Sequence, residues 1–200
     1  MPRLTVGLTG GMGAGKTVVA SRLAALGARV VAADDVAREL VNERGPVFDE
    51  LVCAFGAGIV AADGTLDRRA LARTAFASEE ATGRLNAIVH PPLVARLLSE
   101  LEEGDDILVI DAALLAEWGI LDAFDVTVAV VAPLEQRIER LTSAGYDPVD
   151  ARARIAAQLD PAVVAKRVDI VIENDSSLSD LGRRADEVWR ELLERVRETT

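Results

Sequence analysis

The segment Gly10–Thr17, GGMGAGKT, constrains this chain more than any other feature of its sequence. It matches G-x-x-x-x-G-K-[ST], a pattern typical of loops that bind the phosphates of nucleotides. Glycines allow successive backbone N–H groups to point inward, where a Cβ atom would obstruct them. These N–H groups, together with the positive end of the following helix, bind an anionic polyphosphate. We call Gly10–Thr17 the phosphate loop.

The residue types of the phosphate loop predict separate roles. Lys16 can reach the terminal phosphates, and the hydroxyl of Thr17 can ligate Mg²⁺. The residues expected to bind the nucleotide are Gly11, Met12, Gly13, Ala14, Gly15, Lys16 and Thr17. A glycine-rich turn without a ligand is the alternative. The flanking residues favour the phosphate site, because 3–9 read as a buried strand and 18–26 as a helix.

Five short apolar segments alternate with helical patterns and predict an α/β fold with a five-stranded parallel sheet covered on both faces. The predicted strands are 3–9, 28–33, 106–111, 125–132 and 169–172. After the second strand, one helix is predicted to begin near Asp35. Further helices are predicted at 133–142, 150–159, 161–167 and 183–197. Residues 46–103 have a helical pattern with breaks at 56–58, 62–64 and 90–92, which predicts a helical insertion.

Composition excludes several classes of protein. Half of the 200 residues are apolar, enough for one domain with insertions. No apolar run approaches the roughly 20 residues of a membrane span. A net charge of −11 argues against a general nucleic-acid binder and against an anionic membrane surface.

Residues 1–3 lead directly into the first strand, so we expect no signal peptide and a cytoplasmic protein. Cys53, the one cysteine, cannot form an internal disulfide and is expected in the core.

Carboxylates stand at the carboxyl ends of two of the predicted strands, and binding sites in folds of this kind lie at these ends. Asp34 can accept the proton of a substrate hydroxyl that attacks a γ-phosphate, but it can equally be a helix N-cap. Asp111 can orient Mg²⁺ or contact a substrate, or can simply cap its strand.

Two further features of the sequence contain charged or titratable side chains that can take part in catalysis or substrate binding. The stretch 137–167 contains six basic and four acidic residues, the reverse of the whole chain, and we expect two or three of its basic residues to be functional in a mobile lid. The alternative is a solvated helix face with pairing between neighbouring turns. His90 is the only histidine, and a structural turn before Pro91 is as good an interpretation as a substrate contact.

An ordered series of short segments along nearly the whole chain resembles the dephospho-coenzyme A kinase family. The matching segments are GLTGGMGAGKT from Gly7, the D-x-x-A-R pattern from Asp34, FGAGIVAADGTLDRRALA from Phe55, LNAIVHP from Leu85, IDAALLAE from Ile110, ARIAAQ from Ala153 and VDIVIEN from Val168. The resemblance implies a P-loop NTPase three-layer α/β/α core with a helical substrate-binding insertion and a helical lid. It implies a core of 1–37, 101–137 and 168–200, a coenzyme-binding insertion of 38–100 and a lid of 138–167.

The resemblance also implies a reaction and its residues. It implies transfer of the γ-phosphate of ATP, with Mg²⁺, to the 3′-hydroxyl of the ribose of dephospho-coenzyme A. Lys16, Asp34 and Arg140 take the catalytic positions. The implied nucleotide contacts beyond the phosphate loop are Arg154 and Asn174, the implied acceptor contacts are Asp34, Arg38, His90, Asp111 and Leu114, and the implied Mg²⁺ ligands are Thr17 and, as a second candidate, Asp111. A monomer or weak homo-oligomer is expected, without nucleic-acid or membrane partners.

Several positions depart from the family pattern. Ala32 stands where the family often has the first carboxylate of D-x-D, and Ala144 stands where it often has a second lid arginine. Ala113 replaces a common proline, and Asn174-Asp175-Ser176 replaces N-x-G. Arg137 or Arg152 can supply the missing lid charge. The departures leave open a kinase for another nucleoside or nucleotide hydroxyl, and the loss of charge at Ala144 fits a catalytically inactive binding module. A switch that hydrolyses a nucleotide slowly is an alternative from a different class of function.

Overall fold

The computed structural model describes residues 4–102, 104 and 107–198. The predicted strand positions Arg3 and Asp106, the helical end at Glu103 and the start at residues 1–2 lie outside the described residues. The chain divides into two compact units, one formed by the residues before Ala33 and after Glu100, and one formed by residues 33–100. Each unit is described separately. The assignment of a coenzyme-binding insertion and a lid remains a prediction about function.

The first unit is built on a parallel sheet of five strands, as predicted. They are β1 (Leu4–Thr9), β2 (Arg29–Ala32), β3 (Ile107–Asp111), β4 (Val126–Val131) and β5 (Ile170–Glu173), in the order β2-β3-β1-β4-β5. Every described pairing is parallel, and the register places Asp111 beside both Leu8 and Ala32. Runs of β-branched and apolar residues form these strands because both faces of a parallel sheet are buried.

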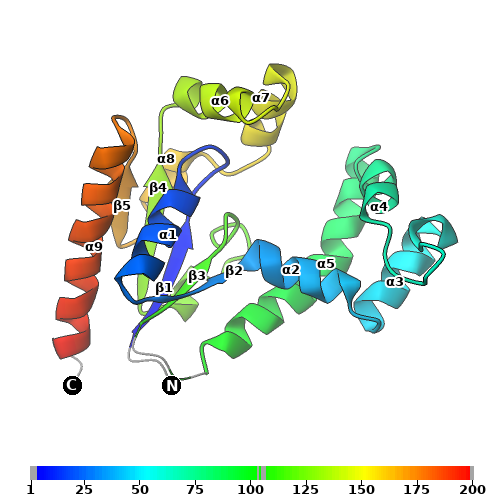
Figure 1. The fold of residues 1–200 in the computed structure, drawn as a ribbon, viewed down its shortest axis with the longest axis horizontal. Helices are drawn as coiled ribbons and strands as arrows, with labels where there is room; N and C mark the ends of the chain where they lie inside the picture. Colours follow the sequence, from blue (N-terminus) through cyan, green and yellow to red (C-terminus); the bar gives the residue numbers. More distant parts are fainter. Residues whose placement is uncertain (1–3, 103, 105–106, 199–200) are drawn as a thin grey trace. The chain divides into compact units, whose positions relative to one another are not determined.

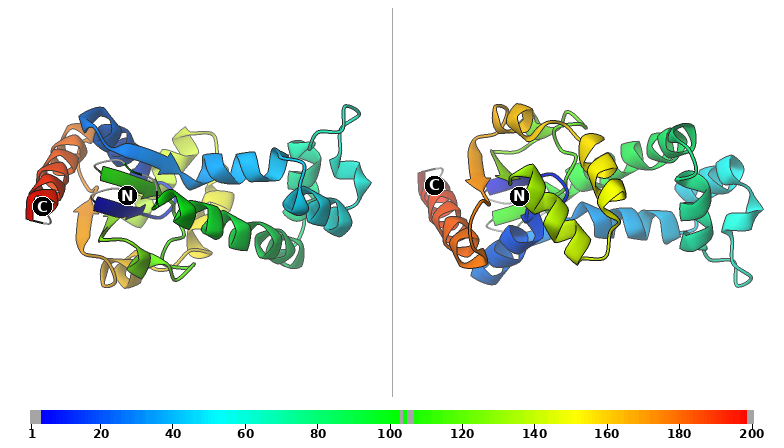
Figure 2. Two further views of the ribbon diagram at one scale, coloured as in Figure 1. Left: turned by 90° about the horizontal axis from the view of Figure 1, so that it is seen from below. Right: turned by 90° about the horizontal axis from the view of Figure 1, so that it is seen from above.

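Helices cover both faces of this sheet (Figure 2). On one face, α1 (Lys16–Leu26) and α9 (Leu178–Glu198) pack on the side chains of Val6, Leu8 and Val128. On the other, α8 (Pro161–Ala165) contacts β4. The Phe124 ring, next to the 3₁₀ turn η2 (Leu121–Ala123), lies so close to Gly7 that a Cβ there would be 2.7 Å from it. The predicted α/β fold is confirmed.

A helical pair lies beside the phosphate loop at the carboxyl end of the sheet (Figure 1). It consists of α6 (Leu134–Ser143) and α7 (Pro148–Ala156). Their facing residues Ile138, Leu141, Ala151 and Ile155 form a small core, against which Met12 packs. The side chain of Asp147 accepts hydrogen bonds from the first N–H groups of α7, and this N-cap explains why the helix begins at Pro148 rather than at the predicted residue 150.

The second unit is entirely helical apart from one isolated bridge, among the described residues. Its elements are α2 (Ala33–Asn42), α3 (Pro46–Phe55), η1 (Ala57–Ile59), α4 (Arg68–Ala75) and α5 (Glu79–Glu100). They enclose a core of their own, with buried Phe48, Leu51, Ile59, Leu71 and Val89. The predicted break after Phe55 is confirmed, because Gly56 ends α3 with a positive φ of 83°.

Two expectations about this unit are wrong. No break occurs at 90–92, because α5 continues through Pro91 and Pro92. Its apolar face, with buried Val89, Leu93 and Leu97, holds the helix together, while Pro91 lies on the exposed face where water can solvate carbonyls that lack a helical partner. Cys53 is exposed rather than in the core. It lies on the face of α3 opposite buried Leu51, two residues and about 200° of helical rotation away.

Candidate active site

The phosphate loop connects β1 to the first residue of α1. Gly13 and Gly15 have φ of 76° and 100°, in the left-handed region that disfavours side chains. The loop is also closely packed, because a Cβ at Gly11 would lie 2.5 Å from the Arg137 guanidinium. Conformation and packing therefore both require glycine at these positions.

Lys16, the first residue of α1, and Asp111, the last residue of β3, form an ion pair. Their side chains are 17% and 9% exposed, so the pair is largely removed from water. Thr17 lies exposed in the first turn of α1. The structure thus brings Asp111 to the phosphate loop, whereas Leu114 lies half-buried in the turn that follows β3.

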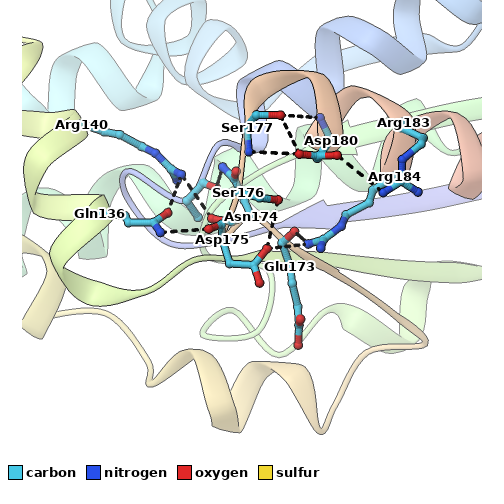
Figure 3. Close-up of polar contacts among 11 residues, drawn as sticks. Gln136, Arg140, Glu173, Asn174, Asp175, Ser176, Ser177, Asp180, Arg183 and Arg184 are labelled. Atoms are coloured by element: carbon cyan, nitrogen blue, oxygen red, sulfur yellow. Dashed lines mark hydrogen bonds and ion pairs between the residues drawn. The ribbon is translucent and has the colours of Figure 1, made fainter.

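Side chains from outside the phosphate loop bind its backbone. The guanidinium of Arg137 donates to the Met12 carbonyl at 2.8 Å, that of Arg140 to the Gly13 carbonyl at 3.2 Å, and the amide of Asn174 to the Ala14 carbonyl at 2.8 Å. Gln158 accepts a hydrogen bond from the Met12 N–H at 2.8 Å. Figure 3 shows Arg140 and Gln136 of α6 directed at the segment that follows β5.

The predicted lid arginines separate into two groups. Arg137 and Arg140 reach the phosphate loop, as described above. Arg152 instead pairs with Glu135 at 3.1 Å, and Arg154 lies 5.7 Å from the centre of the Tyr146 ring. Burial lowers the pKa of the Arg137 guanidinium, which is 3% exposed, although an arginine keeps its charge at neutral pH.

Arg140 and Asn174 were predicted from the sequence as site residues, and Arg137 was one of two candidates for the missing lid charge. Gln158 entered only as part of a segment that matches the family. The contacts of Arg137 and Gln158 with Met12 appear only in the structure. One signal was available, since Arg137 precedes Arg140 by three residues and therefore lies on the same face of a helix.

The second unit contains a pocket of about 260 Å³. It is mainly apolar with a few convergent polar groups, the usual composition of a small-molecule site. Its lining residues are Asp34, Ala37, Arg38, Val41, Arg68, Leu71, Leu85, Asn86, Val89 and His90. The structure thus brings together three predicted acceptor residues, of which His90 lies far from Asp34 and Arg38 in the sequence.

The polar groups of this pocket differ in environment. Asp34 is exposed in the first turn of α2, and Arg38 pairs with Asp35 at 2.6 Å. His90 is half-buried, and burial lowers the pKa of its imidazole. Arg68 donates to the Arg38 carbonyl at 3.3 Å, which joins α4 to α2.

Two kinds of feature are absent from the part of the chain that the structure describes. Residues 4–102, 104 and 107–198 contain no group of three or more His, Cys, Asp or Glu side chains that could hold a metal ion. No helix within the same residues is long and apolar enough to cross a membrane.

Comparisons with known proteins agree with this geometry. The family model of dephospho-CoA kinase matches residues 4–180. A dephospho-CoA kinase of Corynebacterium jeikeium (strain K411) is 48% identical over 192 residues, which cover 93% of this chain and 98% of that protein. One of Thermobifida fusca (strain YX) is 42% identical over 197 residues, covering 96% and 98%.

Solved structures support the fold. A Thermus thermophilus protein has a TM-score of 0.78 at 34% identity, over 96% of this chain and 99% of that one. Dephospho-CoA kinase from Campylobacter jejuni has a TM-score of 0.72 at 21% identity, over 96% and 98%, and supports the fold alone. From the family model and its relatives, this chain belongs to the dephospho-CoA kinase family.

Proposed function

We propose that this protein transfers the γ-phosphate of ATP to the 3′-hydroxyl of the ribose of dephospho-coenzyme A, the last step of coenzyme A synthesis. The observation that carries the proposal is an intact phosphate loop, with Lys16 paired to Asp111, in a chain that matches the family over residues 4–180. Little covalent chemistry is required of a kinase, so binding, orientation and charge stabilisation are what its residues must supply.

The first unit would bind the polyphosphate of ATP. The N–H groups of the phosphate loop and the ammonium of Lys16 would neutralise the β- and γ-phosphates. The exposed hydroxyl of Thr17 and the carboxylate of Asp111 are oxygen donors of the kind that Mg²⁺ prefers, and both lie at this loop. Mg²⁺ held there by Thr17 and Asp111 would supply positive charge that neutralises the charge developing during transfer.

The second unit would bind the acceptor. We assign Asp34 as the base that accepts the proton of the attacking hydroxyl, since its exposed carboxylate lines the pocket. Arg38 and His90 of the same pocket would contact the acceptor, and the family resemblance also assigns Asp111 and Leu114 to the acceptor. The largely apolar lining suits an acceptor with a nucleoside and a long uncharged arm better than a small polar alcohol.

The helices α6 and α7 would act as a lid. We assign Arg140 to the stabilisation of transferring charge and Arg154 to a contact with ATP, and Asn174 to the nucleotide side of the site. Closure of a lid excludes water, which would otherwise accept the phosphate. Arg137 supplies a buried positive charge beside the phosphate loop. This charge would replace that of the second lid arginine, whose position is occupied by Ala144.

We also propose a cellular location and an oligomeric state for this protein. The absence of a spanning helix among the described residues and the single cysteine fit a cytoplasmic protein. We expect a monomer or a weak homo-oligomer, which sedimentation velocity at two protein concentrations would test.

A coupled assay tests the function. Purified protein with Mg²⁺ and ATP would receive dephospho-coenzyme A, adenosine, AMP or no acceptor, and ADP formation would be followed. ADP that forms only with dephospho-coenzyme A, together with a product carrying one more phosphate on its ribose, supports the proposal. ADP that forms with another acceptor, or equally without one, would instead indicate one of the alternative kinases or a hydrolytic switch.

A further inference from the structure

Three consecutive carbonyls of the phosphate loop are each held by a side chain from outside it. Arg137 holds the carbonyl of Met12, Arg140 that of Gly13 and Asn174 that of Ala14. Two of the donors come from α6, and the third comes directly after β5. We call Arg137, Arg140 and Asn174 the carbonyl clamp.

By binding the C=O groups, the clamp also orients the N–H groups of the same peptide units. In a trans peptide, the C=O and N–H groups point in opposite directions. Outward bonds to the Met12 and Ala14 carbonyls therefore turn the N–H groups of Gly13 and Gly15 the other way. The N–H of Ala14, in the peptide between them, donates to the Gly11 carbonyl at 3.0 Å. A hydrogen bond at a carbonyl also polarises its peptide, which strengthens the N–H as a donor to an anion.

The members of the clamp are themselves held by further hydrogen bonds. Arg137 and Asn174 are each 3% exposed. Arg137 also donates to Gln158 at 3.3 Å, and the Asn174 N–H donates to the Val131 carbonyl at 2.7 Å. Arg140 donates further to Gln136 at 2.9 Å and to the Asn174 carbonyl at 3.2 Å, so α6 and the end of β5 are linked through one guanidinium (Figure 3).

The clamp also fills the space on the outer side of the loop. A Cβ at Gly13 would lie 2.8 Å from the Arg137 carbonyl oxygen, and one at Gly15 would collide with the Asn174 amide. These glycines are thus required by contacts on the clamp side as well as by close approach to a phosphate.

We propose that Arg137 and Asn174 are positioning residues and that Arg140 has a positioning role besides its assigned contact with the transferring phosphate. Together they hold the phosphate loop in its anion-binding form and act on any polyphosphate whatever its base. The proposal rests on the nucleotide binding that the proposed function assumes. It gives Asn174 a role through the loop, in place of the direct nucleotide contact that the family resemblance implies. The clamp acts through the loop, so its loss must weaken binding of a polyphosphate that has no base at all.

The test measures binding of two probes with Mg²⁺ and no acceptor: ADP and inorganic triphosphate. The variants are Arg137→Met and Asn174→Ala, and the control is Arg183→Met, which removes an exposed arginine paired with Glu187. By isothermal titration calorimetry, both clamp variants should bind both probes about tenfold more weakly and by a common factor, as expected when a buried carbonyl loses its donor. The control should bind as the unaltered protein does.

Two results would overturn the proposal. One is a loss of ADP affinity with triphosphate affinity unchanged, which would indicate a contact with the base. The other is unchanged affinity for both probes in folded variants. Thermal unfolding establishes the fold, and Asn174→Ala alone carries the test if Arg137→Met does not fold. Failure of dephospho-coenzyme A transfer would be seen only in the assay with acceptor, so it is distinguishable from failure here.

Discussion

The ammonium of Lys16 is paired with the carboxylate of Asp111, so the phosphate loop is tied to the end of β3. Removing one partner of a largely buried pair leaves the other charge uncompensated and costs about 3 kcal/mol or more. The contribution of the pair to stability can therefore be measured separately from the catalytic role that we propose for Lys16.

Lys16→Met should lower kcat at least about a hundredfold, because one donor to the transferring phosphate is lost. It should also lower the free energy of unfolding by about 3 kcal/mol, because Asp111 remains charged and buried. Adding Asp111→Asn should restore most of the stability but none of the activity. Steady-state kinetics and urea unfolding measure both effects. Lys166→Met, at the other and exposed lysine, is the control, and recovery of turnover in the double variant would contradict the assignment.

Asp34→Asn should reduce kcat by about 10² to 10⁴, since the amide cannot accept the proton of the attacking hydroxyl. The affinity for ATP and the unfolding temperature should remain unchanged, because Asp34 is exposed. Asp49→Asn is a matched control, an exposed carboxylate in the first turn of α3. Near-normal turnover of Asp34→Asn would exclude Asp34 as the base.

The imidazole of His90 should titrate below its ordinary pKa of about 6.5, because burial disfavours its charged form. The folded state then binds fewer protons than the unfolded state between the two pKa values. The free energy of unfolding should therefore fall as pH drops below about 6.5 and through the folded-state pKa. The chain has a single histidine, so one NMR titration curve gives the answer. A midpoint at or above 6.5 would refute the prediction.

Thr127→Val should lower the free energy of unfolding by about 1 kcal/mol at neutral pH, because the Thr127 hydroxyl donates to Asp169 at 2.7 Å. This bond is the largest cause that holds the pKa of Asp169 below its ordinary value. Its contribution is present above about pH 4 and is lost as pH falls through the lower folded-state pKa. Urea unfolding from pH 7 to pH 2.5 should show the variant and the unaltered protein converging in acid. Thr142→Val, whose hydroxyl donates to the Ile138 carbonyl, should show a difference that does not depend on pH.

Pro91→Ala should raise the free energy of unfolding by about 1 to 3 kcal/mol, because alanine restores a helical N–H in the interior of α5. Pro91 is exposed, so no core contact is lost. Pro46→Ala, at the first position of α3 where proline fits, should give no such gain. Chemical unfolding of both variants makes the comparison, and a loss of stability in Pro91→Ala would show that the proline is needed there.

Local patterns were sufficient for much of this protein. The run from Leu4 to Thr9, the glycine spacing and Lys16 predicted strand, phosphate loop and helix, because each depends on residues close in sequence. Alternation of apolar strands with helices predicted the parallel sheet. Prediction of the break at Pro91 was wrong, because burial of Leu93 and Leu97 outweighs the local cost of proline. Cys53 was misplaced because an apolar helix does not reveal which of its faces is buried.

The fold class, the phosphate loop and the candidate residues Asp34 and Asp111 could all be predicted without coordinates, since period, spacing and residue chemistry are local properties. Three relationships became visible only in the folded chain: Lys16 pairs with Asp111, His90 shares a pocket with Asp34, and Arg137 and Asn174 bind the carbonyls of the loop. These contacts join residues up to 160 positions apart. They form because the packing of the sheet and helices brings distant carbonyls and side chains into contact. A pattern of neighbouring residues does not specify such contacts.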